Sequence, residues 1–106
     1  MITKFRLNLT LLVIVLAAPL VMFGQSEKPK VSVLLVTGAN NHDWQYTSKH
    51  MAAILEKTGR FQVTTTTDPA SFLAIEDLMD FDVIYLDYNG PRWGEAAEAK
   101  FLAAVQ

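Results

Sequence analysis

Short apolar runs alternate with segments of helical spacing along most of this chain. Runs rich in β-branched residues predict three strands, at residues 31–36, 61–67 and 81–86. Apolar residues three or four positions apart predict three helices, at residues 47–58, 71–79 and 95–106. The resulting β-α-β-α-β-α order indicates an α/β fold, with a parallel sheet and helices on both of its faces.

The strands differ in how deeply we expect them to lie. The first, Val31–Val36, is apolar at nearly every position, which is typical of a strand buried on both faces of a parallel sheet. The second carries four consecutive threonines, which suits the edge of the sheet. In a flavodoxin-like sheet of strand order 2-1-3, a ligand would bind at the carboxyl ends of strands 1 and 3.

The ends and inner faces of the helices can also be predicted. Thr47 or Ser48 is expected to cap the start of the first helix, and Gly59 to end it. The expected inner face of the second helix consists of Phe72, Ile75, Leu78 and Met79. That of the third helix consists of Ala97, Phe101, Leu102 and Val105.

The segment before the first strand has the three parts of a secretory signal. Lys4 and Arg6 precede an uncharged apolar stretch at 9–23, and small or polar residues follow. About 15 apolar residues are too few to span a bilayer core, which needs about 20. We therefore predict a signal peptide at 1–26, a linker at 27–30, and export to the periplasm or the cell exterior. Because no clean A-x-A cleavage site is present, an uncleaved anchor is the alternative.

The charge and composition of the chain exclude several classes of binding partner and cofactor. Without Lys4 and Arg6, seven basic residues face eleven acidic ones, a net charge of −4. A mildly acidic chain without a basic run argues against nucleic acid, or a membrane beyond the signal peptide, as a partner. The absence of cysteine excludes disulfides, thiol catalysis and thiolate metal sites. No P-loop or G-x-G-x-x-G motif follows the first strand, so a nucleotide cofactor is not expected.

Two polar loops rich in aromatic residues follow strands 1 and 3, at residues 38–46 and 87–93. Together they hold both tryptophans of the chain and one of its two histidines. Amides, carboxylates and aromatic faces suit a carbohydrate, whose hydroxyls take hydrogen bonds and whose ring faces stack on aromatic side chains. The candidate substrate-binding residues are Asn40, Asn41, Trp44, Asp87, Asn89 and Trp93.

His42 is the candidate catalytic residue, with Asp43 to orient it. A histidine can act as general acid and base because its unperturbed pKa lies near neutral. Two alternatives stay open: His42 as one metal ligand, or as a loop residue that hydrogen-bonds Asp43 or the backbone. A catalytic zinc needs about three protein ligands, and the other histidine, His50, falls in the first predicted helix.

Other loop residues carry alternatives of the same kind. Trp44 and Trp93 either stack on a sugar or cover the top of the sheet, and the asparagines either bind a ligand or serve the turn. Gly38 is expected to allow a close backbone approach. Arg92 either pairs with a carboxylate or phosphate, or lies free on the surface.

Two segments carry a resemblance to a known family. They are Val-Leu-Leu-Val-Thr-Gly-Ala-Asn-Asn-His-Asp-Trp at 33–44 and Phe-Asp-Val-Ile-Tyr-Leu-Asp-Tyr-Asn-Gly at 81–90, with Trp93 after them. This pattern resembles the opening of ThuA-like (trehalose-utilisation) domains, which are similar in fold to class I glutamine amidotransferases. The resemblance covers nearly all of residues 30–106 and implies a carbohydrate or keto-sugar substrate.

The resemblance also predicts that the domain is incomplete. In the family a glycine-rich strand and a histidine-bearing loop come next, and this sequence ends before them. Residues 31–106 are therefore expected to be the N-terminal part of a truncated ThuA-like domain, with its first three β-α units. Its remaining C-terminal part would then be needed as a partner for folding.

Three functions are compatible with these features, and whether the protein is an enzyme is left open. The first is an exported ThuA-like protein that acts on or binds a carbohydrate or keto-sugar. The second is a non-catalytic sugar-binding module of a larger exported protein. The third is an amidotransferase-like hydrolase whose nucleophile lies beyond residue 106.

Overall fold

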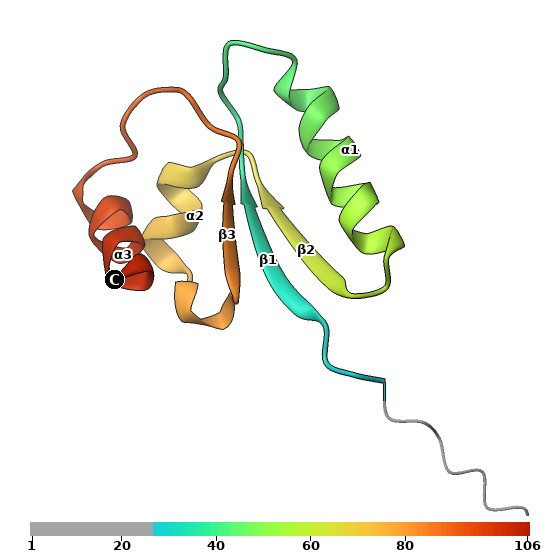
Figure 1. Cartoon of the computed structure of the whole chain (residues 1–106). Helices are drawn as coiled ribbons and strands as arrows, with labels where there is room; N and C mark the ends of the chain where they lie inside the picture. Colours follow the sequence, from blue (N-terminus) through green and yellow to red (C-terminus); the bar gives the residue numbers. More distant parts are fainter. Residues whose placement is uncertain (1–26) are drawn as a thin grey trace, which may run out of the picture.

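The computed structural model describes residues 27–106, and the predicted signal peptide at 1–26 lies outside the described residues. Residues 27–30 are exposed and lead into the first strand. The elements then follow in the predicted order (Figure 1): β1 (Val31–Val36), α1 (Trp44–Lys57), β2 (Phe61–Thr66), α2 (Pro69–Ile75), the short 3-10 helix η1 (Leu78–Asp80), β3 (Val83–Leu86) and α3 (Glu95–Val105).

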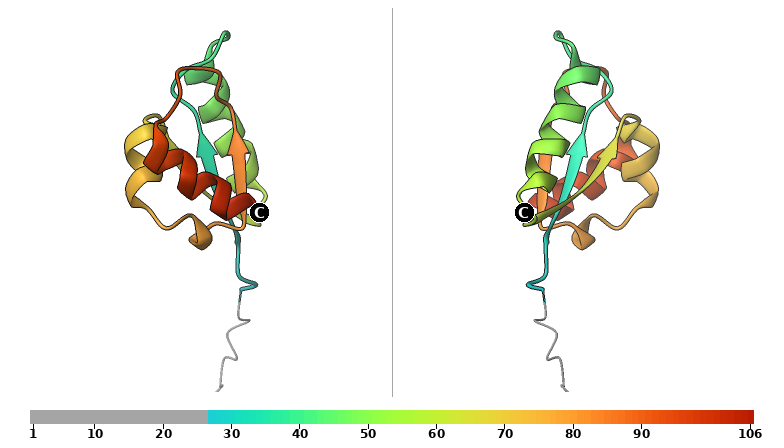
Figure 2. Two further views of the ribbon diagram at one scale, coloured as in Figure 1. Left: turned by 90° about the vertical axis from the view of Figure 1, so that its left-hand side faces the viewer. Right: turned by 90° about the vertical axis from the view of Figure 1, so that its right-hand side faces the viewer.

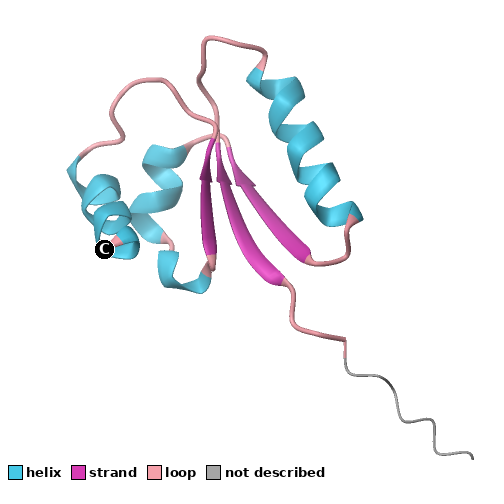
Figure 3. Cartoon of the chain, viewed as in Figure 1, coloured by secondary structure: helices cyan, strands magenta, loops and turns pink. Residues whose placement is uncertain are grey.

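The three strands form one parallel sheet in the order β2-β1-β3 (Figure 3). β1 is the central strand, and its last four residues are buried. The threonine-rich β2 lies at one edge, as predicted, and β3 lies at the other edge of the described sheet. The predicted α/β fold with a flavodoxin-like 2-1-3 order is therefore confirmed.

The helices cover both faces of the sheet, and the main core lies on one of them. Figure 2 shows α2 and α3 together on the face opposite to α1. Side chains alternate along a strand, so Leu34 and Val36 of β1 share one face. They pack against Leu73 of α2, Leu78 of η1 and Ala97 of α3, all of them buried. β1 pairs with β3 as far as Val36 and Leu86, so the carboxyl ends of the two strands lie side by side.

The start of α1 differs from the prediction. The helix begins at Trp44 because Asp43 caps it, and the Asp43 carboxylate accepts a hydrogen bond from the Tyr46 amide at 3.1 Å. The predicted cap at Thr47 or Ser48 is wrong, because both residues lie inside the helix. The predicted end is confirmed, since Gly59 follows the last turn and donates its amide to the Glu56 carbonyl.

The inner face predicted for the second helix is only half right. Phe72 and Leu78 pack into the core, but Ile75 is 75% exposed and Met79 is 73% exposed. The backbone becomes extended at Glu76, so α2 ends there and η1 starts afresh with a different phase. A single helical period across 71–79 therefore places Ile75 and Met79 wrongly.

The inner face of α3 is shifted in the same way. Ala97 is buried and Phe101 and Ala104 pack on the core, at spacings of four and three residues. Leu102 and Val105, which were predicted to face inward, are each 54% exposed.

Gly38 allows a close backbone approach, as predicted. Its φ is +117°, in the region that favours glycine, and a Cβ atom placed there would lie 2.1 Å from the carbonyl oxygen of Thr67. Two chain segments that leave neighbouring strands can therefore cross in contact. None of the helices in residues 27–106 is long and apolar enough to cross a membrane.

Candidate functional site

The loops after β1 and β3 are tied to each other at the carboxyl edge of the sheet. The Asp87 amide donates to the Val36 carbonyl at 2.9 Å, and the Asn89 amide donates to the Ala39 carbonyl at 2.8 Å. The Gly90 backbone also lies close to Ala39, because a Cβ atom at Gly90 would lie 2.5 Å from the Ala39 side chain. The backbones of the two loops are therefore held against each other at this edge of the sheet.

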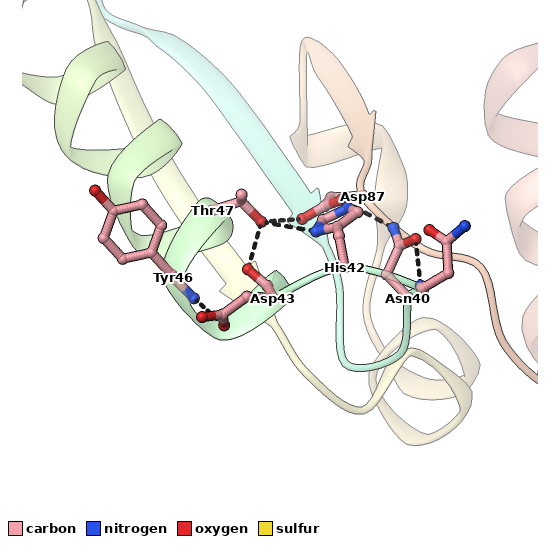
Figure 4. A network of polar contacts seen from close by, with 7 residues as sticks. Asn40, His42, Asp43, Tyr46, Thr47 and Asp87 are labelled. Carbon is pink, nitrogen blue, oxygen red and sulfur yellow. Dashed lines mark hydrogen bonds and ion pairs between the residues drawn. The ribbon is translucent and has the colours of Figure 1, made fainter.

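The Asp87 carboxylate is the centre of a polar cluster at this edge (Figure 4). Its Oδ1 atom lies 3.0 Å from His42 Nε2 and accepts a hydrogen bond from Asn40 Nδ2, also at 3.0 Å. Its Oδ2 atom accepts from the Thr47 hydroxyl at 3.3 Å. Three side chains from the β1–α1 loop and α1 thus converge on one carboxylate at the end of β3.

Thr47 completes the cluster from the first turns of α1. Its Oγ1 atom lies 3.3 Å from His42 Nδ1 and 3.0 Å from the Asp43 carbonyl oxygen. The imidazole is therefore bounded on both nitrogens, by Asp87 on one side and by Thr47 on the other. We refer to His42, Thr47, Asp87 and Asn40 as the His42 cluster.

The side chains of the His42 cluster differ in how far they are exposed to solvent. The Asp87 side chain is 13% exposed, whereas the His42 side chain is 42% exposed. A shielded carboxylate behind an accessible imidazole is an arrangement suited to general acid–base chemistry, because the charge that supports the ring is removed from water.

The structure brings together only some of the predicted site residues. Asn40, His42 and Asp87 meet directly, but the Asp43 carboxylate caps α1. Among the described residues, the carboxylate within ion-pair distance of the His42 ring is that of Asp87, not that of Asp43. Thr47 was not predicted as a site residue, because the sequence suggested a cap there.

Neither tryptophan joins the His42 cluster. Trp44 is half-buried and lines a hollow between α1 and β2 with Ser48 and Thr65. Trp93 packs edge-on against Tyr88 and Phe101, with ring centroids 5.5 and 5.4 Å apart. Its ring belongs to the core on the α2–α3 side. The interpretation of Trp93 as cover for the sheet is therefore the one that its packing supports.

The amide side chains of the loops differ in their contacts. The Asn40 carbonyl oxygen accepts from the Asn41 amide at 2.8 Å, which stabilises the turn while its amide group serves Asp87. Asn41 and Asn89 are exposed at the same edge. In residues 27–106, no group of three or more side chains of the His, Asp and Glu types is placed to hold a metal ion. The metal-ligand alternative for His42 thus has no support from its neighbours in that range.

Arg92 pairs with a carboxylate, which was one of its two predicted roles. Its Nε atom donates to Glu98 Oε1 at 2.8 Å, and its Nη2 atom contacts Glu98 Oε2. The Trp93 amide donates to the same carboxylate at 3.1 Å. The Arg92 hydrogen bonds and charge, supported by this amide, lower the pKa of Glu98 from 4.5 to about 2.

This ion pair predicts a dependence of stability on acid pH. Glu98 has a lowered pKa in the folded state, so its contribution is present above about pH 4.5 and is lost as the pH falls towards about 2. We expect the free energy of unfolding of the full protein to fall less steeply across this window in Glu98→Gln than in the wild type. Urea unfolding at several pH values measures this.

Glu95→Gln is the matched control for this prediction. Glu95 lies in the same first turn of α3, and no ion pair involving it is found in the described part of the chain. Its substitution should leave the wild-type pH dependence in place. Equal slopes in Glu98→Gln and the wild type would contradict the role given to the Arg92 pair.

The fold and the His42 cluster define a class of protein. A parallel sheet of order 2-1-3, with polar side chains gathered where the first and third strands end, is a doubly wound α/β unit of the flavodoxin-like kind. Ligands of this class bind in the crevice outside those strand ends. The His42 cluster occupies that position.

Comparison with solved structures identifies the family. The chain is similar to a protein of Parabacteroides merdae with the provisional designation ThuA-like protein, with 35% identity and a TM-score of 0.66. The match covers 74% of this chain and 29% of that one, so the chain spans less than a third of its length. No model of a known protein family matches the chain, and no curated protein matches it. The chain belongs to the ThuA-like family.

Proposed function

We propose that this protein carries out proton transfer on a carbohydrate or keto-sugar at the carboxyl ends of β1 and β3. The observation that carries the proposal is the contact of an accessible imidazole with a shielded carboxylate, His42 Nε2 to Asp87 Oδ1 at 3.0 Å. The substrate class comes from the resemblance to ThuA-like domains.

Each member of the cluster has a role in this proposal. His42 takes a proton from a hydroxyl, or from a carbon next to a carbonyl, and later returns one. Asp87 orients the ring and stabilises the positive charge that the ring acquires. Asn40 holds Asp87 through the 3.0 Å hydrogen bond. Asn41 and Asn89, exposed beside the cluster, would bond the sugar hydroxyls.

The position of the tryptophans favours an enzyme over a binding module. Sugar-binding sites commonly stack a ring face on an aromatic side chain, yet neither Trp44 nor Trp93 belongs to the His42 cluster. The groups gathered in the cluster are instead ones that move and hold protons.

Export of the protein is a second part of the proposal, and it is supported by the signal-peptide pattern of residues 1–26. The mass of the mature protein would test it, because cleavage of a signal peptide shortens the chain.

The test is a screen of the full protein against sugars and keto-sugars, with product detection by mass spectrometry and binding by calorimetry. We expect at least one compound to be converted, and His42→Ala to abolish conversion while binding is largely kept. The His50→Ala variant is the control, because His50 stacks on Tyr46 at 4.8 Å outside the cluster.

Two outcomes would count against this proposal. Sugar binding without any product, lost on substitution of Asn41 or Asn89 but kept in His42→Ala, would favour the non-catalytic sugar-binding module. Conversion that is unchanged in His42→Ala would remove the acid–base role of this residue and point to chemistry elsewhere in the protein.

A further inference from the structure

A second group of polar and aromatic side chains lies between α1 and β2, apart from the His42 cluster. α1 runs alongside β2 (Figure 1), and the two elements border a hollow of about 640 Å³. This volume falls within the range of about 300 to 1,000 Å³ that is usual for small-molecule sites. The hollow shares no residue with the His42 cluster, since Thr47 contacts Asp87 on the β3 side of α1.

The hollow exists because α1 turns small side chains towards β2. Ser48, Ala52 and Ala53 line it from the helix. On the opposite face of the sheet, by contrast, the buried side chains of Leu73 and Leu78 fill the space over β1. Small residues on the β2 side of α1 therefore leave open a volume that larger apolar residues would occupy.

Hydroxyl groups line both walls of the hollow. Thr65 and Thr67 line it from the strand side, because side chains two positions apart lie on the same face of a sheet. Ser48, which is only 5% exposed, adds a hydroxyl from the helix. A purely apolar ligand would leave such groups without partners, which is costly. The hollow therefore favours a ligand that forms hydrogen bonds.

An aromatic ring lies at one end of the hollow and a carboxylate at the other. Trp44 is half-buried at the start of α1, and Glu56 lies near its end, where the carboxylate accepts from the Val63 amide at 3.4 Å. At a rise of 1.5 Å per residue, these two positions are about 18 Å apart along the helix. Lys49 lies between them and balances the charge of Glu56. These features suit a neutral ligand that is longer than one sugar ring.

We propose that the hollow between α1 and β2 binds a neutral oligosaccharide, with one sugar ring stacked on Trp44. The apolar face of a sugar ring packs on an indole, and its hydroxyls pair with the hydroxyl groups of Ser48 and Thr65 and the amide of Gln45. The proposal goes beyond the proposed function, because it concerns a different set of residues and requires no reaction. Such a site would hold a sugar chain beside the His42 cluster rather than at it.

The test is fluorine NMR of the full protein labelled with fluorotryptophan and titrated with cellobiose and with maltose. The resonance of Trp44 is identified by its loss in Trp44→Phe. Trp93 serves as the internal reference, because its ring packs on Phe101 in the core on the α2–α3 side. We expect at least one of the two disaccharides to shift the Trp44 resonance saturably and to leave the Trp93 resonance unchanged.

Two substitutions at the hollow should weaken this binding, as measured by calorimetry. Ala53→Leu places a larger side chain in the hollow and keeps a good helix former in α1, so we expect a loss of affinity of tenfold or more. Trp44→Leu removes the stacking face, which should weaken binding about three- to tenfold. Ala99→Leu is the matched control, because Ala99 is an exposed alanine of α3 outside the hollow, and its affinity should equal that of the wild type.

Three results would overturn the proposal. The first is the absence of a saturable shift of the Trp44 resonance with either disaccharide. The second is equal affinity in Ala53→Leu and the wild type, with an unchanged circular dichroism spectrum showing that the variant is folded. The third is binding that is weakened by Asn41→Ala but not by Ala53→Leu, which would place the sugar at the His42 cluster. None of these results depends on conversion of a substrate, so failure here is distinguishable from failure of the proposed function.

Discussion

Replacing Gly38 by alanine is expected to lower the free energy of unfolding of the full protein by about 3 kcal/mol or more. Two effects add at this position. The φ of +117° disfavours any residue with a side chain, and the new Cβ atom would lie 2.1 Å from the Thr67 carbonyl oxygen. Since the obstacle is backbone rather than a flexible side chain, relief requires movement of the segment after β2. Urea unfolding measures the loss.

Gly59→Ala is the matched control for Gly38→Ala. Its φ of +71° also disfavours a side chain, but nothing lies within 4 Å of the added Cβ atom. We expect a loss of about 1 kcal/mol, due to backbone strain alone. Equal losses in the two variants would show that the contact with Thr67 contributes nothing to the cost.

With a converted substrate in hand, Asp87→Asn is expected to lower kcat by about 10²- to 10⁴-fold. Asparagine keeps the shape of the side chain but removes the charge that supports a protonated His42 ring. Substrate affinity should change much less than kcat, because the ring supported by Asp87 acts in the reaction.

Asp43→Asn gives the comparison that decides which carboxylate supports His42. An asparagine at this position can still accept the hydrogen bond from the Tyr46 amide, so α1 keeps its cap. We expect kcat to remain within about threefold of the wild type. A large loss in Asp43→Asn with a small one in Asp87→Asn would restore Asp43 as the orienting residue and contradict the assignment made from the geometry.

The sheet could be predicted because its signals are local and strong. The apolar run of β1 and the run of four threonines that begins in β2 identify a central and an edge strand without knowledge of their partners. Helix phase was less predictable where the backbone changes course inside an apolar segment. Two extended residues, Glu76 and Asp77, separate α2 from η1, and nothing in the apolar spacing marks them.

The candidate site was predictable in its location but not in its contacts. The carboxyl ends of strands 1 and 3 of a 2-1-3 sheet adjoin, so His42 and Asp87 could be expected to lie near each other. Whether Asp43 or Asp87 contacts the His42 ring depends on where α1 begins. The sequence does not settle this, because Asp43, Thr47 and Ser48 can all cap a helix. Because Asp43 caps α1, Thr47 lies inside the helix, where its hydroxyl contacts Asp87. A residue that the sequence suggested as a helix cap is therefore a residue of the candidate site.

The bond from the Asn89 amide to the Ala39 carbonyl has a consequence for how this protein can vary among its relatives. The bond makes the lengths of two loops about fifty residues apart depend on each other. An extra residue in either loop would break the bond or displace the other loop. Gly90 strengthens the coupling, since its backbone lies against the Ala39 methyl group with no room between them. Insertions among relatives should therefore occur at the turn between α1 and β2, where a Cβ atom at Gly59 would have no neighbour within 4 Å.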